Sequence, residues 1–420
     1  MRRSIFTFLV LWLSVFDVPM AIGADWYVST SGNNADGTSW ASAWDEFDQV
    51  DWGDISAGDT VVIDGGATGT TTTYSTNMTI ITSGTSENRI TIERSKASGH
   101  DGSVIMLSSQ IYVNSPYITI DGKDSDKFWV YYPDISGMVV NVAEAADYFE
   151  FRNIYVSGDG DFDLSNWGSL FRSYCEHILI SNCKFGLTNG EDQLKYTHPG
   201  GYVVIEDSYF YGLINHDGYH CDALEVSSQE GVNVTARRNI FDQPTDQFMM
   251  KSDGEQTMGV LDFSYNVFLQ VGDAIKFHTC AELILHNNTF YGGREIVTYA
   301  PLPSVSSRNN LYTGLNQYGN AVHQSPDPQY CLWDVDTEEF VIGTGNIQAG
   351  PLFVDKDGHD VRVQVGSPAI NAGTSLGYTV DVLGNPIVGL PDIGAYEYQG
   401  TPTVLFYLHD GSLKFRYWEP

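Results

Sequence analysis

Hydrophobic and polar residues alternate in short runs through the middle of the chain, and each run ends in an aromatic residue followed by a turn signal. The runs begin near residues 148, 177, 201, 231, 259, 281 and 304. Their aromatic residues are Tyr155, Phe185, Phe210, Phe241, Phe268, Phe290 and Tyr312, at separations of 22 to 31 residues. Alternation indicates a strand, and the Asn or Gly that follows indicates a turn. The pattern therefore predicts a repeated unit of strand and turn.

A second alternating segment lies between these units. Four such segments begin with Asp in one phase and a fifth has Arg in the same position, so they start at Asp192, Asp222, Asp246, Asp273 and Arg294. Several short strands per repeat without helical periodicity predict a parallel β-helix, a solenoid whose coils stack their strands into sheets. Leucine-rich repeats need a regular Leu/Asn pattern that is missing, and propeller blades need about 40 residues.

The ends of the chain depart from the repeat. Two arginines, a short apolar stretch and small residues predict a secretory signal over residues 1–23, so we expect a secreted monomer that is not inserted in a membrane. Residues 24–320 are predicted to form the β-helix, with an amphipathic helix over Ala43–Val50 capping its open end. Residues 321–400 are predicted to form an irregular β-rich extension, and residues 401–420 a tail without an assigned role.

Composition narrows the class of partner. The 420 residues contain 21 Lys+Arg against 53 Asp+Glu, which gives a net charge of −32. This charge argues against nucleic acid or an anionic membrane as the main partner. Gly is frequent, at 42 residues, as expected for a turn-rich β protein. The five cysteines lack metal-binding spacing, and a core of this size needs no disulfide.

Stacked coils turn equivalent strand positions into columns on the surface. We align the segments on inward residues, namely Leu194, Leu224, Phe248, Ile275 and Ile296. The outward residues then include Lys195, Glu225, Met249 and Lys276 and, two positions on, Lys251, His278 and Tyr299, with Arg294 at the edge. In this register Lys251 neighbours His278 on the next coil. Basic residues are few in the middle half of the chain, so we interpret this face as a groove for a polymer.

Parts of the sequence resemble two known groups of proteins. The opening "WYVSTSGNNADGTSW" and the late "GSPAINAG" and "DIGAYEY" resemble secreted bacterial right-handed parallel β-helix proteins, many of them pectate-lyase-like. The stretch from "QFMMKS" to "HNNTFYGG" is similar to polysaccharide lyase family 6, the chondroitinase-B and alginate lyases. Lys251 and Ser252 match the Lys-Ser of that family, which implies Lys251 as the base. His278 stands where the family has Arg, and Asp246 represents its calcium-binding acidic pair.

These residues suit a β-elimination on a uronate polysaccharide. The reaction needs the C6 carboxylate neutralised, a base for the C5 proton and a proton donor for O4. A lysine acts as base only when neighbouring cations or burial lower its pKa, and Lys276, His278 and Ca²⁺ are the candidates near Lys251. We therefore predict a lyase acting on an acidic polysaccharide. The predicted catalytic residues are Lys251, His278 and Lys276, the substrate-binding residues Lys195, Glu225, Arg294 and Tyr299, and the Ca²⁺ ligands Asp222 and Asp246.

Alternatives stay open. Asp at the start of successive strands favours capping of turn amides over metal binding. A glycoside hydrolase on the same fold would use paired carboxylates, for which Asp222, Glu225 and Asp253 are available. A carbohydrate-binding β-helix without catalytic activity would show neither kind of product.

Overall fold

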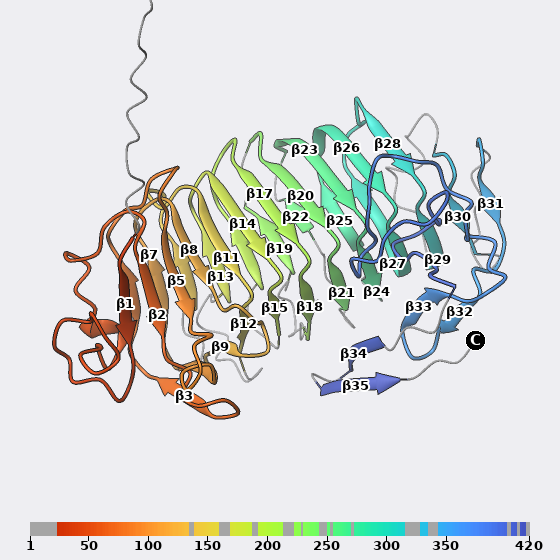
Figure 1. Ribbon diagram of the computed structural model, residues 1–420. Coiled ribbons are helices and arrows are strands. Elements are labelled where there is room, and N and C mark those ends of the chain that lie inside the picture. Colours follow the sequence, from red (N-terminus) through yellow and green to blue (C-terminus); the bar gives the residue numbers. More distant parts are fainter. Residues whose placement is uncertain are drawn as a thin grey trace, which may run out of the picture.

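The computed structural model describes most of the chain outside the N-terminal segment. The described residues are 23–133, 138–158, 169–186, 192–212, 222–227, 230–242, 250–252, 255–269, 273–315, 328–334, 343–400, 405–409 and 412–416. The predicted secretory signal, except for Gly23, lies outside them. The strands stack along one axis, from the N-terminal coils at the left of Figure 1 to the C-terminal part at the right. The predicted right-handed parallel β-helix is confirmed.

Three parallel sheets, here called A, B and C, form the walls of the solenoid. Sheet A contains β1 (Asp25–Val28), β2 (Thr60–Ile63), β5 (Ile90–Arg94), β8 (Ile118–Asp121), β11 (Phe149–Arg152), β14 (His177–Ser181), β17 (Tyr202–Glu206), β20 (Asn233–Arg237), β23 (Thr257–Ser264), β26 (Thr279–His286) and β28 (Val305–Arg308). Sheet B contains β3 (Thr71–Tyr74), β6 (Ser103–Leu107), β9 (Phe128–Tyr131), β12 (Tyr155–Ser157), β15 (Lys184–Phe185), β18 (Tyr209–Tyr211), β21 (Ile240–Asp242), β24 (Val267–Leu269), the first half of β27 (Thr289–Thr298), β29 (Leu311–Leu315), β30 (Leu332–Trp333) and β31 (Ile347–Gln348). Sheet C contains β4 (Met78–Ile80), β7 (Ile111–Val113), β10 (Val140–Val142), β13 (Phe171–Ser173), β16 (Leu194–Tyr196), β19 (Leu224–Val226), β22 (Met250–Ser252), β25 (Asp273–Phe277) and the second half of β27.

Aromatic residues stack through the interior from coil to coil. Neighbouring ring centroids lie 4.7 to 5.3 Å apart along the series Phe185, Phe210, Phe241, Phe268, Phe290, Tyr312 and Trp333. Each fully buried ring contributes about 1.5–3 kcal/mol relative to an exposed one. Tyr155 was predicted to be the first aromatic residue of this series. That prediction is wrong, because the strand register pairs Val156, not Tyr155, with Phe185, and Tyr155 pairs with Lys184. An offset of one residue moves a side chain to the other face of a strand.

A ladder of buried asparagines holds the tight turn between sheets A and B. Asn239, Asn266, Asn288 and Asn310 occupy equivalent positions in four successive coils. The Asn266 carboxamide oxygen accepts from the backbone N–H of Asn239 at 3.0 Å, and its amide donates to the carbonyl of Ala236 at 2.8 Å. The ladder therefore satisfies the backbone groups that the sharp turn takes out of the sheets.

The N-terminal cap differs from the prediction. The expected helix over Ala43–Val50 is wrong, since only a 3₁₀ turn, η1 (Phe47–Gln49), forms in this segment. Trp44 instead joins the edge of sheet A by a parallel bridge to Val28, and its N–H donates to the Tyr27 carbonyl at 3.1 Å. Ala43, Trp44, Phe47 and Val50 are buried all the same. The apolar spacing thus predicted burial correctly, while the sheet edge determined the backbone.

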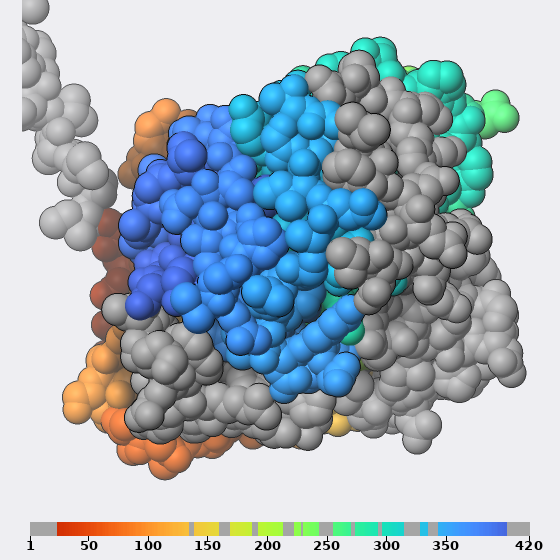
Figure 2. Space-filling model, turned by 90° about the vertical axis from the view of Figure 1, so that its right-hand side faces the viewer, coloured from red at the N-terminus to blue at the C-terminus, as the bar shows by residue number. Residues whose placement is uncertain are grey.

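The C-terminal extension covers the outer face of sheet B. Apolar side chains that point outward from sheet B, including Val267, Leu269 and Leu311, form a second core with residues of the extension such as Phe353 and Ile393. Sheet B itself continues past residue 320 through β30 and β31. The hairpin β32 (Phe353–Asp355) and β33 (Asp360–Val363) belongs to this layer, shown in blue in Figure 2.

Three further features bear on the predictions. The tail contains an antiparallel hairpin, β34 (Leu405–His409) and β35 (Ser412–Arg416). Cys175, Cys183, Cys280 and Cys331 are buried free thiols, and Cys221 lies outside the described residues. Across the described part of the chain, no helix has the length and apolar character needed to cross a bilayer.

Candidate functional site on sheet C

A column of charged residues runs along the middle of sheet C, one residue per coil. The strand pairings align Arg172, Lys195, Glu225, Lys251 and Lys276 on five successive strands, from β13 to β25. Successive strands of a sheet are about 4.8 Å apart, so these five positions span about 19 Å. A column of four basic residues and one acidic residue is unusual in a chain with a net charge of −32.

The register of β22 differs from the prediction by two residues. Met250, not Phe248, pairs with Leu224 and Ile275, so Lys251 pairs with Glu225 and Lys276. The predicted pairing of Lys251 with His278 on the next coil is therefore wrong. Alternation has a period of two, and a shift by two residues keeps the same side chains inside, so the sequence pattern alone could not detect the error.

Lys195 and Glu225 form an ion pair at the start of an acidic cluster. The Lys195 ammonium nitrogen lies 3.1 Å from Glu225 Oε1 and 3.6 Å from Asp192 Oδ2. Asp192, Asp222 and Glu225 are all buried, and one carboxylate oxygen from each lies within 4.8 Å of the others. The backbone N–H of Asp222 donates to Asp192 Oδ1 at 3.1 Å. The capping role expected from repeated Asp residues is thus seen for Asp192, together with a convergence of carboxylates that capping does not require.

The carboxylates of this cluster repel one another, which changes their pKa values. Burial, reinforced by the negative charges of Asp222 and Glu225, raises the pKa of Asp192 well above its usual range. Burial would also raise the pKa of Glu225, but contacts with Asp192, Ser227 and Lys195 hold that pKa at about 2. The cluster therefore keeps Glu225 ionised, while the Lys195 ammonium only partly offsets the burial and the negative charges that disfavour the ionised form of Asp192.

The cluster fits the requirements of a hard divalent cation. Asp192 Oδ2 is buried and accepts no hydrogen bond within the described residues. A cation bound here would displace the proton of Asp192, and the three ionised carboxylates and the Lys195 ammonium would then carry a net charge of −2, which one Ca²⁺ would balance. Calcium is coordinated by oxygen ligands, and carboxylates bind it in monodentate or bidentate fashion. Asp192, Asp222 and Glu225 are thus the residues that would hold it, and Asp192 and Glu225 were not among the predicted ligands.

The downstream end of the column carries an exposed aromatic ring. The Lys276 ammonium lies 5.7 Å from the ring centre of Tyr299, whose exposed fraction is 63%. His278 is half-buried, two residues beyond Lys276, and its carbonyl accepts from the Tyr299 N–H at 3.2 Å. Lys276 therefore contacts the Tyr299 ring, while His278 contacts Tyr299 through the backbone.

Arg172 was missed by the sequence interpretation. It extends the column upstream of Lys195, and its guanidinium lies 5.0 Å from the ring centre of Tyr174. The sequence did contain a signal for it. In "LFRSY" Arg172 follows an inward apolar residue and precedes another inward residue, as Lys195 does in "QLKYT". Arg294 pairs in register with Asp273. The side chains of Lys251 and Arg294, and all of Met249, Asp246 and Asp253, lie outside the described part of the chain.

Comparisons with known proteins give distant structural likenesses and no family. Neither protein-family models nor curated proteins give a match. Among solved structures, pectate lyase Pel9A has a TM-score of 0.49 and 16% identity over 90% of this chain and 97% of that one. XylC in complex with xylose has a TM-score of 0.49 and 8% identity over 89% and 98%. The GH136 lacto-N-biosidase from Eubacterium ramulus has a TM-score of 0.36 and 11% identity over 71% and 67%.

Proposed function

We propose that the protein is a polysaccharide lyase that cleaves a uronate-containing polysaccharide by β-elimination, with Lys251 as the base. The observation that carries the proposal is the position of Lys251 in the charged column, between Glu225 on one strand and Lys276 on the next. A lysine base must be neutral, a form that a neighbouring positive charge such as Lys276 would favour and that Glu225, whose charge already pairs with Lys195 at 3.1 Å, would oppose less than a free carboxylate.

The column supplies the other groups that the reaction needs. Lys251 takes the C5 proton, the C4–C5 double bond forms, the C4–O4 bond breaks, and O4 leaves with a proton. Basic residues along the column, Arg172, Lys195 and Lys276, would pair with the carboxylates of successive sugar units. His278 is the candidate proton donor for O4. It lies two residues beyond the strand partner of Lys251.

Calcium is the expected partner of the acidic cluster. Asp192, Asp222 and Glu225 would hold the ion, which would supply positive charge beside the column and so favour an acidic polysaccharide there. We expect calorimetric titration with CaCl₂ to show binding that Asp222→Asn weakens at least tenfold. The control Glu87→Gln, which removes an exposed carboxylate of the N-terminal coils, should leave the calcium affinity unchanged.

Product analysis tests the proposed function. A lyase acting on pectate, alginate or a glycosaminoglycan releases unsaturated uronates, whose conjugated double bond absorbs ultraviolet light. Rising absorbance on at least one of these polymers is the expected result. New reducing ends without that absorbance would indicate a hydrolase using the paired carboxylates. Binding to the polymers without either product would indicate a carbohydrate-binding protein.

A further inference from the structure

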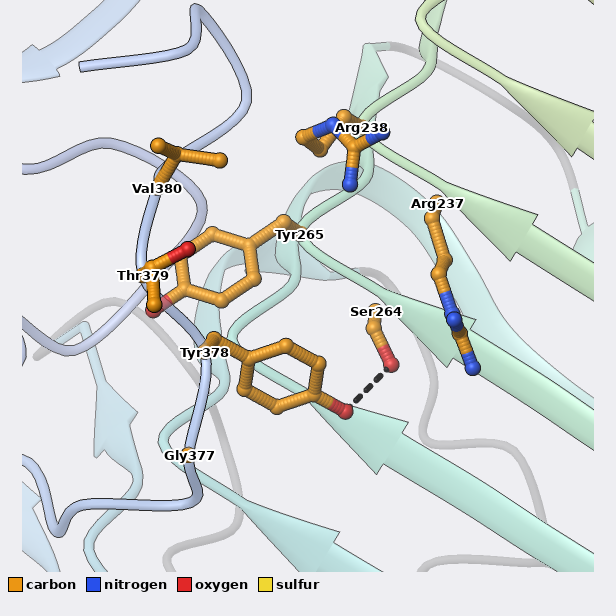
Figure 3. A pocket seen from close by; sticks show the side chains of 8 residues that line it. All are labelled: Arg237, Arg238, Ser264, Tyr265, Gly377, Tyr378, Thr379 and Val380. Carbon is orange, nitrogen blue, oxygen red and sulfur yellow. Dashed lines mark hydrogen bonds between the residues drawn. The ribbon is translucent and has the colours of Figure 1, made fainter. Parts of the chain in front are cut away.

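A cavity of about 200 Å³ lies where the extension meets the turn between sheets A and B. Arg237 and Arg238 come from the end of β20, Ser264 and Tyr265 from the end of β23, and the loop 377–380 closes the other side. Figure 3 shows Tyr378 hydrogen-bonded to Ser264, with Arg237 beyond Ser264 and Tyr265 next to the loop 377–380. The cavity belongs to a different part of the solenoid from the column on sheet C.

A hydrogen-bond chain starts at two hydroxyls that line this cavity, those of Ser264 and Tyr378, and continues to residues behind them. The Tyr378 hydroxyl lies 2.8 Å from Ser264 Oγ and 3.1 Å from His286 Nδ1, and His286 Nε2 lies 2.9 Å from Ser306 Oγ. The Ser264 hydroxyl donates to the carboxylate of Asp262. Burial lowers the pKa of His286 to about 4, so its ring is neutral at neutral pH. A neutral imidazole both donates and accepts, which lets every hydroxyl in the chain donate toward Asp262.

The arginines give the cavity hydrogen-bond donors without a net positive charge. Arg237 pairs with Asp262, and Arg238 binds Asp207 through two nitrogens, at 2.6 and 2.8 Å. The Arg237 side chain nevertheless stays 43% exposed, and Nη2 is the nitrogen that lies against Asp262. A ligand oxygen can therefore receive hydrogen bonds here, while an anion gains little because each guanidinium already has a carboxylate partner.

We propose that this cavity binds a neutral pyranose ring. Its hydroxyls act as donors and acceptors, matching the guanidinium groups and the tyrosine and serine hydroxyls, and its C–H groups suit the two tyrosine rings, which meet edge to face with centroids 5.3 Å apart. The volume lies below the range of about 300–1,000 Å³ that drug-sized ligands fill, so one ring fits and a longer segment does not. The site is independent of the proposed lyase activity. It prefers a neutral sugar, whereas the basic column prefers an acidic one.

The test uses the full-length protein and saturation-transfer NMR with D-galactose and D-galacturonate, which differ only at C6. We expect D-galactose to bind the cavity and D-galacturonate to bind it more weakly. Arg237→Gln should weaken D-galactose binding at least tenfold. The matched control is Arg152→Gln, since Arg152 ends a strand of sheet A three coils upstream and pairs with Glu150 at 2.8 Å without lining the cavity.

Three outcomes would overturn the proposal. These are the absence of D-galactose binding, stronger binding of D-galacturonate, and loss of D-galactose binding in Lys251→Ala, which would place the sugar on sheet C. Thermal unfolding of each variant checks the fold. If Arg237→Gln does not fold, Tyr378→Phe replaces it, because it removes one hydroxyl that lines the cavity and keeps the ring. Unchanged D-galactose binding in Tyr378→Phe would then contradict the assignment.

Discussion

The asparagine ladder and the charged column are both built by repeating one position per coil, yet they differ in chemistry. Every member of the ladder is the same residue, is buried and bonds to the next coil, as Asn266 does to Asn288 at 2.9 Å. The column instead changes sign between Lys195, Glu225 and Lys251. A uniform ladder satisfies itself and stabilises the stack, whereas a mixed column leaves charge for a ligand to complete. In this solenoid, the positions that change from coil to coil are therefore the candidates for ligand binding.

Breaking the ladder should have the largest effect on stability. Asn266→Ala removes the acceptor for the Asn239 N–H and side-chain amide and the donor to the Ala236 carbonyl. Buried groups left without partners cost about 1–3 kcal/mol each, so we expect the free energy of unfolding to fall by about 3 kcal/mol or more. Denaturant unfolding measures this loss. Asn114→Ala, at an exposed turn, is the control and should change little. An equally small change for Asn266→Ala would show that the ladder does not stabilise the stack.

Changing the column should affect activity and leave stability nearly unchanged. Lys276→Met keeps the aliphatic stem and removes the charge beside Lys251. We expect kcat/KM to fall about 10- to 100-fold, which corresponds to about 1.4–2.7 kcal/mol. Unfolding should shift by less than about 0.5 kcal/mol. Lys356→Met, which alters a lysine of the extension, serves as the control. A large loss of stability with normal activity would assign Lys276 to the scaffold.

The extension should respond to pH through buried carboxylates. Burial, with the charges of Asp392 and Asp381, raises the pKa of Glu397 to about 7 from its usual 4.5. A raised pKa in the folded state means that protonation stabilises the fold, so this contribution is complete below about pH 4.5 and is lost as the pH rises through 7. We therefore expect a lower melting temperature at pH 8 than at pH 5.5. Glu397→Gln should flatten this dependence, and an unchanged slope in that variant would contradict the assignment.

The exposed ring at the end of the column should have the smallest effect. Tyr299→Leu removes the cation–π contact with Lys276, worth about 0.5–1 kcal/mol at an exposed site. We expect KM to rise about two- to fivefold with kcat unchanged, as measured by steady-state kinetics on the polymer that is cleaved. A fall in kcat without a change in KM would mean that Tyr299 acts in the chemical step.

Much of this architecture could be predicted from alternation and aromatic spacing, because both report directly on which side chains face the core. The error at Tyr155 was a slip of one residue, and the error at Lys251 was a slip of two. Both errors arose because turn lengths vary between coils. The alternation of apolar and polar residues shows which residues of a strand face the core, but it does not show how many residues the preceding turn contains. The convergence of Asp192 with Glu225 depends on that same register. The cavity at Arg237 could not be predicted, since it requires the docked position of a loop 140 residues further on, at Gly377.

The most direct test of the central claim is the initial rate of Lys251→Ala, measured by ultraviolet absorbance on the polymer that the wild-type protein cleaves. Removal of a general base costs about 10²- to 10⁴-fold in rate. We expect a loss in that range with an unchanged melting temperature, while Lys356→Ala keeps the wild-type rate. A Lys251→Ala variant with the full wild-type rate would contradict the assignment of sheet C as the active face.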